Sequence, residues 1–161
     1  MLFRSRAGTG AVVDEDGTVV TVNYVVLGAQ RVMVTDVEGK RFPARVVAQD
    51  FASGIAVLSV AGAASPPLRR GGSRDDGPGD DVFLVASVGA TERRSASGFI
   101  VATDSFDAYW EYFLPRALWI SAINPGLGGA PLCDSRGRFI GVISLNLGAI
   151  GRATLDRKSV V

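Results

Sequence analysis

The most informative absence in this 161-residue chain is that of histidine. Histidine is the usual general base of nucleophilic hydrolases and the commonest metal ligand, so its absence excludes Ser-His and Cys-His pairs and the ordinary zinc sites. Lysine is scarce too: Lys40 follows a turn-like Glu38-Gly39 pair, and Lys158 lies near the C-terminus. Neither position favours a Ser-Lys dyad. The sequence therefore predicts no metal site and no cofactor.

Other scarcities narrow the class of protein. Cys133 is the only cysteine and cannot form an internal disulfide. No apolar run approaches the roughly 18 residues of a membrane-spanning helix, and no charged-then-apolar N-terminal signal is visible, which leaves the localisation unknown. A net charge of +1 provides no field to attract nucleic acid. We expect a compact folded unit whose partner is a protein or a peptide.

What the chain does have is a succession of short β-branched runs separated by turn residues, which is typical of an antiparallel barrel or sandwich. The first expected strands are Ala11–Val13, Thr18–Val22, Arg31–Val37, Arg41–Ala48 and Ile55–Val60. The later ones are Val82–Val88, Ala96–Thr103, Leu118–Ile123, Phe139–Ser144 and Ile150–Leu155. We predict an all-β chain with an N-terminal β-barrel over residues 1–65, a linker over 66–80 and a C-terminal β-barrel over 81–161.

A glycine-rich loop stands between two apolar runs of the second half. It reads Ile-Asn-Pro-Gly-Leu-Gly-Gly-Ala-Pro-Leu from Ile123 to Leu132. Its glycines allow positive φ and close backbone approach, and its prolines fix the entry and the exit. Such a loop is either a structural turn or an anion nest of backbone N–H groups, an oxyanion-like pocket. The residues that would form this pocket are Gly126, Leu127, Gly128 and Gly129.

Three motifs, in the family's order, resemble the HtrA (DegP-like) branch of the trypsin-fold serine proteases over residues 8–155. The opening hairpin ends in Asn-Tyr-Val-Val, where the family has Asn-His-Val-Val. A later segment reads Gly-Ile-Ala-Val-Leu, where the family has Asp-Leu-Ala-Leu-Leu. The glycine-rich loop is similar to the family's Asn-Pro-Gly-Asn-Ser-Gly-Gly-Pro-Leu. The resemblance implies a trypsin-like double antiparallel β-barrel, with two six-stranded barrels and a cleft between them.

All three catalytic positions depart from the family pattern. By this resemblance, Tyr24 stands at the position of the histidine base, Gly54 at that of the aspartate and Gly128 at that of the serine. A phenol with a pKa of about 10 is a poor base at neutral pH, and glycine cannot orient an imidazole. Without a hydroxyl or thiol nucleophile there is no acyl-enzyme. The sequence predicts an inactive serine protease homologue, a pseudoprotease with no catalytic residue.

The resemblance also implies a peptide-binding strand. In active members of the family, the far end of the strand that residues 137–146 resemble pairs with the substrate backbone. Ser144, Leu145 and Asn146 are the corresponding residues, and an open sheet edge accepts an extended peptide by strand addition. The resemblance further suggests an extracytoplasmic or periplasmic setting and a homo-oligomer.

Between two expected strands lies a cluster of aromatic residues, Phe106, Tyr109, Trp110, Tyr112 and Phe113. The spacing of all but Tyr112 predicts a helix, with Asp104 or Ser105 as the N-cap and Pro115 as the stop. These rings either pack onto the second barrel or form an exposed patch for a protein partner, because Tyr and Trp are enriched in binding hot spots.

The function predicted from the sequence is non-catalytic protein or peptide binding, or scaffolding. A rival from another class is a hydrolase with a relocated nucleophile, for which the candidates are Ser97, Ser121, Ser144 and Cys133. A second rival is a trypsin fold repurposed to bind an anion or a metal through carboxylates. Its candidate ligands are Asp75, Asp76, Asp80 and Asp81.

Overall fold

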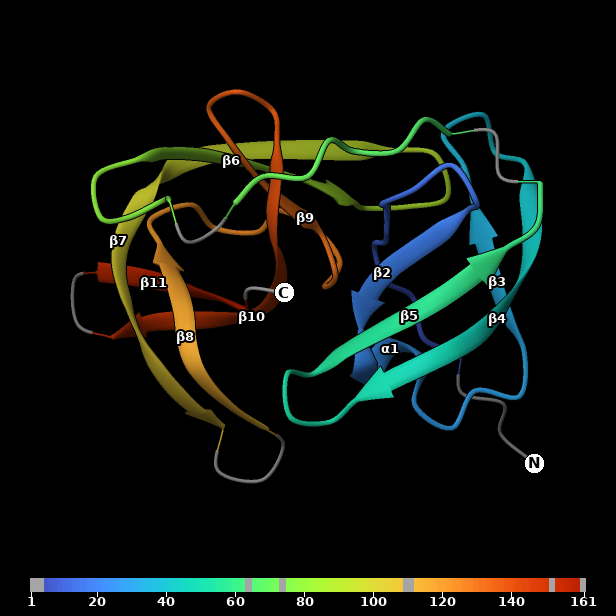
Figure 1. Cartoon of the computed structure of the whole chain (residues 1–161), viewed down its shortest axis with the longest axis horizontal. Helices are drawn as coiled ribbons and strands as arrows, with labels where there is room; N and C mark the ends of the chain where they lie inside the picture. Colours follow the sequence, from blue (N-terminus) through green and yellow to red (C-terminus); the bar gives the residue numbers. More distant parts are fainter. Residues whose placement is uncertain (1–4, 63–64, 73–74, 109–111, 151–152, 160–161) are drawn as a thin grey trace.

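The computed structural model describes residues 5–62, 65–72, 75–108, 112–150 and 153–159, and nearly all of its regular structure is β-strand (Figure 1). The N-terminal elements are β1 (Ala11–Val12), β2 (Thr18–Val22), α1 (Asn23–Val26), β3 (Val32–Thr35), β4 (Arg41–Asp50) and β5 (Ile55–Val60). The C-terminal elements are β6 (Asp81–Ser87), β7 (Arg93–Ala108), β8 (Tyr112–Ile120), β9 (Pro131–Asp134), β10 (Phe139–Ile150) and β11 (Ala153–Ser159). No helix within these ranges is long and apolar enough to cross a membrane.

The first sheet has the strand order β1-β2-β5-β4-β3, with every neighbouring pair antiparallel. The described residues form five strands here, the number that the sequence pattern predicts, whereas the family resemblance implies six. β1 is only two residues long, and it and β3 are the two edges of the sheet. The sheet nevertheless curls, because Val12 of β1 and Val32 and Val34 of β3 pack against the same apolar cluster. It therefore encloses its core as a half-barrel.

Hairpins in both halves use the same turn chemistry. Each turn begins with an aspartate whose Oδ1 accepts backbone N–H groups two and four residues later, at distances of 2.8–3.1 Å. The fourth residue of each turn is a glycine at positive φ. Glycine adopts this conformation without steric strain because it has no Cβ. The aspartate and glycine pairs are Asp14 with Gly17, Asp36 with Gly39, and Asp134 with Gly137. This local signature explains why the two N-terminal hairpins could be predicted from the sequence.

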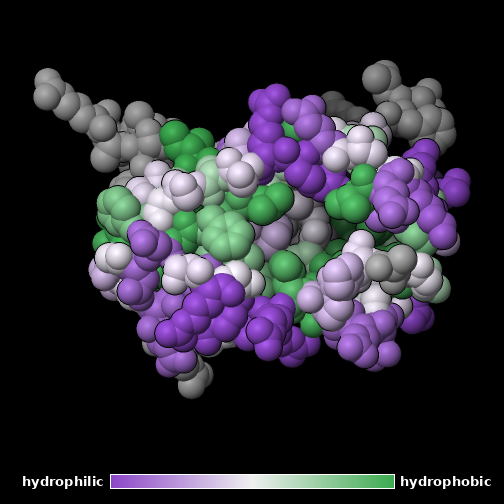
Figure 2. Space-filling view, turned by 90° about the horizontal axis from the view of Figure 1, so that it is seen from above, coloured by the Kyte–Doolittle hydropathy of each residue, from purple (hydrophilic) through white to green (hydrophobic). Residues whose placement is uncertain are grey.

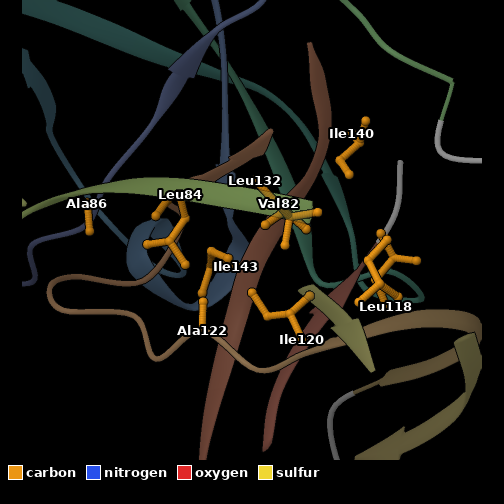
Figure 3. Close-up of a cluster of buried hydrophobic side chains, with 11 residues drawn as sticks. Val82, Leu84, Ala86, Leu118, Ile120, Ala122, Leu132, Ile140 and Ile143 are labelled. Atoms are coloured by element: carbon orange, nitrogen blue, oxygen red, sulfur yellow. The ribbon is translucent and has the colours of Figure 1, made fainter. Parts of the chain in front are cut away.

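The second sheet closes into a six-stranded barrel in the order β10-β11-β8-β7-β6-β9, as predicted for this half. Along β6, Val82, Leu84 and Ala86 are buried while the residues between them are half-buried, which is the period of two expected of a strand with one face on the core. Leu118 and Ile120 of β8 face the same interior, and the labelled side chains converge there (Figure 3). These side chains form the apolar core cluster of the barrel.

Two strands differ from the sequence prediction. β9 was not expected, because it has only four residues and begins at Pro131, within the segment interpreted as the glycine-rich loop. Proline is tolerated at the first position of a strand, and pairing with β6 and β10 supplies the missing stability. The expected strand Ile150–Leu155 joins the end of β10 to the beginning of β11, which are two separate strands.

The predicted aromatic helix is wrong: β7 and β8 form a long antiparallel hairpin over this segment. Phe106 pairs with Leu114, and both are buried with Ala117 in a small apolar cluster of their own. Tertiary packing of this cluster overrides the helical spacing of the sequence. Tyr109 and Trp110 lie outside the described residues.

The two sheets share one apolar cluster. Val22 of β2 and Ile55 of β5 pack there with Phe139 and Val142 of β10. The connecting segment joins them as well: Leu68 packs on this cluster, and its N–H donates to the Val12 carbonyl at 2.9 Å. Figure 1 shows this segment crossing from one sheet to the other. The site described next lies at this junction.

Candidate functional site

The single-turn helix α1 carries Tyr24 to the junction of the two sheets. At its start, the Asn23 N–H donates to the Gly54 carbonyl at 2.7 Å. At its end, the Arg6 guanidinium donates to the carbonyls of Tyr24 and Leu27 at 2.8 and 2.9 Å. A helix this short cannot be stable alone, so these contacts hold its backbone. They fix the place from which the Tyr24 ring projects.

Tyr24 and Gly128 fit together as one unit, although they are 104 positions apart. A Cβ built on Gly128 would overlap the Tyr24 hydroxyl and would lie 3.0 Å from Tyr24 Cζ. The Tyr24 hydroxyl also donates to the backbone carbonyl of Ser144 at 3.5 Å. The phenol thus occupies the space in which any side chain at position 128 would begin. The structure brings together two of the three positions that the resemblance assigns to the triad.

Gly54, the third of these positions, serves the β4–β5 turn. It is buried, has φ of 73°, and its N–H donates to the Asp50 carbonyl at 2.9 Å. This positive φ favours glycine, although aspartate tolerates it better than most residues with a Cβ. Gly54 therefore acts through its backbone, which closes the turn and accepts the first N–H of α1.

Three N–H groups of the glycine-rich loop have internal acceptors. Gly126 donates to Asn124 Oδ1 at 3.1 Å, Leu127 to the Ser87 carbonyl at 2.9 Å, and Gly129 to the Ile143 carbonyl at 2.9 Å. Backbone donors engaged in this way are not available to an anion. The geometry therefore favours the structural turn over the anion nest at these three residues.

Thr9 positions this loop and was missed by the sequence reasoning. It is buried, its N–H donates to the Gly128 carbonyl at 2.7 Å, and its hydroxyl donates to the Leu127 carbonyl at 3.0 Å. The same hydroxyl accepts the Ser87 N–H at 2.9 Å, and the Thr9 carbonyl accepts the Thr21 hydroxyl at 2.7 Å. The only sequence signal is a lone threonine between Gly8 and Gly10.

Ser144 lies on β10 beside the Tyr24 hydroxyl. Ser144 is buried, and β9 pairs with β10 only between Phe139 and Val142. On its other side, β10 continues to pair with β11, including Leu145 with Arg157. Among the described strands, none pairs with the β9 side of β10 beyond Val142. The side chains of Leu145 and Asn146 lie outside the described part of the structure.

The relocated nucleophiles are poorly placed. Cys133 is buried, and its burial together with the nearby Asp134 carboxylate raises the pKa of the thiol to about 11. Almost no thiolate is then present at neutral pH, so Cys133 is unreactive. Ser121 Oγ is engaged as acceptor of the Phe99 N–H at 3.0 Å, whereas Ser97 is exposed on β7.

The acidic segment offers no metal cage within the residues described: no group of three or more metal-ligating side chains occurs there. Burial raises the pKa of Asp76, and repulsion from Asp134 adds to this effect. The Asp76 Oδ2 atom is buried without a hydrogen-bond partner in the described structure. In contrast, Asp134 is buried but bound by Arg138 at 2.6 Å, so its pKa is lowered although burial alone would raise it.

The aromatic residues do not form one surface. Phe106 is buried, whereas Phe113 is 56% exposed, and the side chain of Tyr112 is not described. A second apolar area lies on β6 and β7, where Phe83 and Phe99 line an open hollow of about 430 Å³. Figure 2 shows hydrophobic residues gathered in the middle of one face, with hydrophilic residues around them. Of the two rings of the predicted patch whose side chains the structure describes, only Phe113 is exposed.

Comparison of the sequence with known proteins identifies its family. The Trypsin-like peptidase domain model matches residues 8–142. A probable periplasmic serine endoprotease, DegP-like, from Halomonas elongata is 32% identical over 147 residues, or 88% of this chain and 30% of that protein. The corresponding protein of Chlamydia trachomatis serovar D is 32% identical over 135 residues, or 84% of this chain and 27% of that protein. The chain spans less than a third of the length of these relatives.

The fold is also found among solved structures. The HtrA-type protease AlgW, solved with a decapeptide, superposes with a TM-score of 0.83 at 22% identity. The superposition covers 96% of this chain and 48% of that one. At this level of identity the likeness concerns the fold, which is all-β with two curled antiparallel sheets. Because the family model matches residues 8–142, which is most of the chain, the chain belongs to the trypsin-like peptidase domain family, in its HtrA/DegP-like branch.

Proposed function

We propose that this chain is a non-catalytic trypsin-like domain, a pseudoprotease, that serves protein or peptide binding or scaffolding. The observation that carries the proposal is that the Tyr24 hydroxyl fills the space above Gly128, where the nucleophilic side chain of an active relative would stand. A serine hydroxyl needs that space and a base beside it. Here the space is filled by a phenol, and the chain has no histidine.

The three altered positions support one another. Gly54 has a positive φ, which favours glycine, and a Cβ at position 128 would overlap the Tyr24 hydroxyl in its present place. Restoring a serine at 128 alone would therefore create an overlap rather than a nucleophile. Loss of the triad costs on the order of a million-fold in rate. The chain is not expected to turn over peptide at a useful rate.

The binding role is inferred from what remains of the family's architecture. The relatives are named periplasmic serine endoproteases, and we extend to this chain an extracytoplasmic setting and a polypeptide partner. Two surfaces are candidates: the β9 side of β10 at Ser144, Leu145 and Asn146, and the beginning of β8 at the exposed Phe113. A homo-oligomer stays a proposal.

The absence of catalysis is tested with fluorescein-labelled casein and a fluorophosphonate probe, with the DegP-like protein of Halomonas elongata assayed in parallel. We expect casein cleavage by this chain to stay at the level of buffer and the probe to label no residue. Cleavage that co-purifies with the chain, together with labelling of a serine or of Cys133, would establish the relocated nucleophile instead.

The binding surface is tested by affinity capture with the intact domain and with a variant carrying alanine at Tyr109, Trp110 and Tyr112. Phe51→Ala is a matched control, because Phe51 is an exposed ring on the other half of the molecule. A partner lost only by the triple variant places binding on the hairpin, and one retained by all three places it on the cleft. Capture of nothing by any of them would count against a binding role.

A further inference from the structure

We propose that the hollow on the outer face of β6 and β7 binds an arginine side chain of a polypeptide partner. The proposal goes beyond the proposed function, because the triad positions lie outside the lining of the hollow and its role does not depend on whether the domain cleaves. It concerns two rings and one carboxylate, those of Phe83, Phe99 and Asp81.

The register of β6 and β7 places these groups on one face of the sheet. Asp81 pairs directly with Phe99, and Phe83 pairs with Ser97. Residues that are paired across two strands share a face, and so do residues two positions apart along one strand. Val82, between Asp81 and Phe83, is buried in the core on the opposite face. The four side chains therefore project from the outer face of the barrel, around an open hollow of about 430 Å³.

The apolar part of the hollow continues the buried junction of the two sheets. Phe83 pairs with Cys133 of β9, and Cys133 pairs with Phe139 of β10, which packs with Leu68 of the connecting segment. Phe139 and Cys133 are buried, Phe83 is half-buried, and Phe99 is 49% exposed. The apolar face is therefore covered where the connecting segment crosses it and is open to a partner at Phe99.

The charge around the hollow favours a cation. Asp81 is exposed, and the ion pairs found among the described residues do not include it. Asp80 precedes it and adds a second negative charge, whereas Arg136, which follows Ser135 of the lining, adds one positive charge. The carboxylates therefore outnumber the cation beside the hollow. A neutral apolar ligand would leave the Asp81 carboxylate without a partner.

Two phenyl rings beside a carboxylate suit a guanidinium in particular. The planar group of arginine stacks on an aromatic face, and its parallel N–H groups match the two oxygens of a carboxylate. In the described part of the chain, the cation–π contact is that of Lys40 with Phe42, so no cation of this chain lies over Phe83 or Phe99 there. Ligand pockets have volumes of about 300–1,000 Å³, so the hollow is large enough for one long side chain.

The test is an NMR titration of the isotope-labelled protein with the peptide Gly-Ser-Ala-Arg-Ala-Ser-Gly. A second peptide carries citrulline, an uncharged isostere, in place of the arginine. The backbone amide shifts report both the affinity and the place of binding. We expect the largest shifts at Asp81, Phe83 and Phe99, and a Kd for the arginine peptide about tenfold below that for the citrulline peptide.

Three variants examine the carboxylate and the ring separately. Asp81→Asn, Phe99→Ala and Phe99→Leu should each weaken binding of the arginine peptide about fivefold, because leucine keeps an apolar contact but has no aromatic face. The controls are Asp75→Asn and Phe51→Ala, which remove an exposed carboxylate and an exposed ring that do not line the hollow. Both controls should leave the Kd unchanged.

The proposal is overturned if the two peptides bind equally, if neither shifts the signals around the hollow, or if a lysine peptide binds as tightly as the arginine peptide. Shifts at Phe99 that depend on protein concentration without peptide would place a second copy of the chain in the hollow instead. Should the Phe99 variants fail to fold, Asp81→Asn decides alone: an unchanged Kd rejects the proposal. Cleavage of either peptide, seen by mass spectrometry, would reject the non-catalytic function and leave this site untouched, so the two failures are distinct.

Discussion

Substitution of Gly128 by alanine tests directly whether Tyr24 fills the space above this residue. An alanine Cβ would overlap the Tyr24 hydroxyl, whereas the next neighbour, Val22 Cγ2, would be at an ordinary 3.7 Å. Tyr24 is thus the main obstacle. The expected result is destabilisation of the parent protein and none in a background that lacks the tyrosine ring.

The magnitude follows from two opposing effects. Adding a methyl group to a filled site costs about 1–3 kcal/mol. The backbone of Gly128 is not left-handed, so alanine also restricts the unfolded chain and gains about 0.4–1 kcal/mol. Because the Tyr24 ring can turn toward solvent, the cost should lie low in its range, with a net loss of about 1 kcal/mol. In the Tyr24→Ala background a gain of about 0.5 kcal/mol is expected, which gives a coupling of about 1.5 kcal/mol.

The assay is urea-induced unfolding of the parent, Gly128→Ala, Tyr24→Ala and the double variant, followed by fluorescence of the two tryptophans. A change of 1 kcal/mol corresponds to about 2–4 °C in Tm for a domain of this size, so thermal unfolding provides a second readout. Gly89→Ala is the control, because no atom lies within 4 Å of its Cβ and its φ is not positive. Its effect should be the same with and without Tyr24.

Additive effects of Gly128→Ala and Tyr24→Ala, within about 0.5 kcal/mol, would refute the reasoning, because contacting residues are expected to couple. Such a result would mean that the phenol does not occupy this space in solution. A coupled result with the sign reversed would show that alanine improves the packing of the ring.

The remaining predictions concern the loop, the acidic segment and the cysteine. Gly129→Ala should destabilise the protein by more than about 3 kcal/mol in urea unfolding, because φ of Gly129 is 90° and the new Cβ would overlap the Thr9 carbonyl. The control is Gly28→Ala, which should cost only about 1 kcal/mol, because Gly28 has a φ of 68° and open space around the place of its Cβ. The pKa of Asp76 is raised in the folded state by burial, so its contribution to stability is lost as pH rises through that pKa. Asp76→Asn should therefore stabilise the protein by about 0.5 kcal/mol at pH 7 and not at pH 3. The control is the same substitution at the exposed Asp75. An equal effect of Asp76→Asn on stability at both pH values would contradict the raised pKa of Asp76. Iodoacetamide should label Cys133 in the native protein at pH 8 about 100-fold more slowly than in urea, and comparable rates by mass spectrometry would show that the thiol is accessible.

Much of the fold could be predicted because its signals are local. The turns from Asp14 to Gly17 and from Asp36 to Gly39 close through contacts within five residues, so their sequence predicts the hairpins around them. The alternation along β6 likewise requires only neighbouring residues. The trypsin-like resemblance rested on such segments in their order, and the family match agrees with it.

The sequence predictions were wrong where contacts between residues far apart in the chain decide the secondary structure. Phe106 and Phe113 have helical spacing, yet pairing across β7 and β8 buries the first and exposes the second. No pattern along the chain distinguishes these outcomes, because the stabilising contacts of Phe106 lie on the opposing strand, at Leu114 and Ala117. β9 depends in the same way on strands β6 and β10.

For the site, the sequence by itself determined that the chain has no histidine, and the family resemblance predicted that Tyr24, Gly54 and Gly128 stand at the triad positions. Only the tertiary structure decided how these residues fit, with the Tyr24 hydroxyl over Gly128 and against the Ser144 carbonyl. The physical reason is that composition limits which reactions are available, whereas van der Waals overlap and hydrogen bonding depend on distances between residues that only the folded chain brings together.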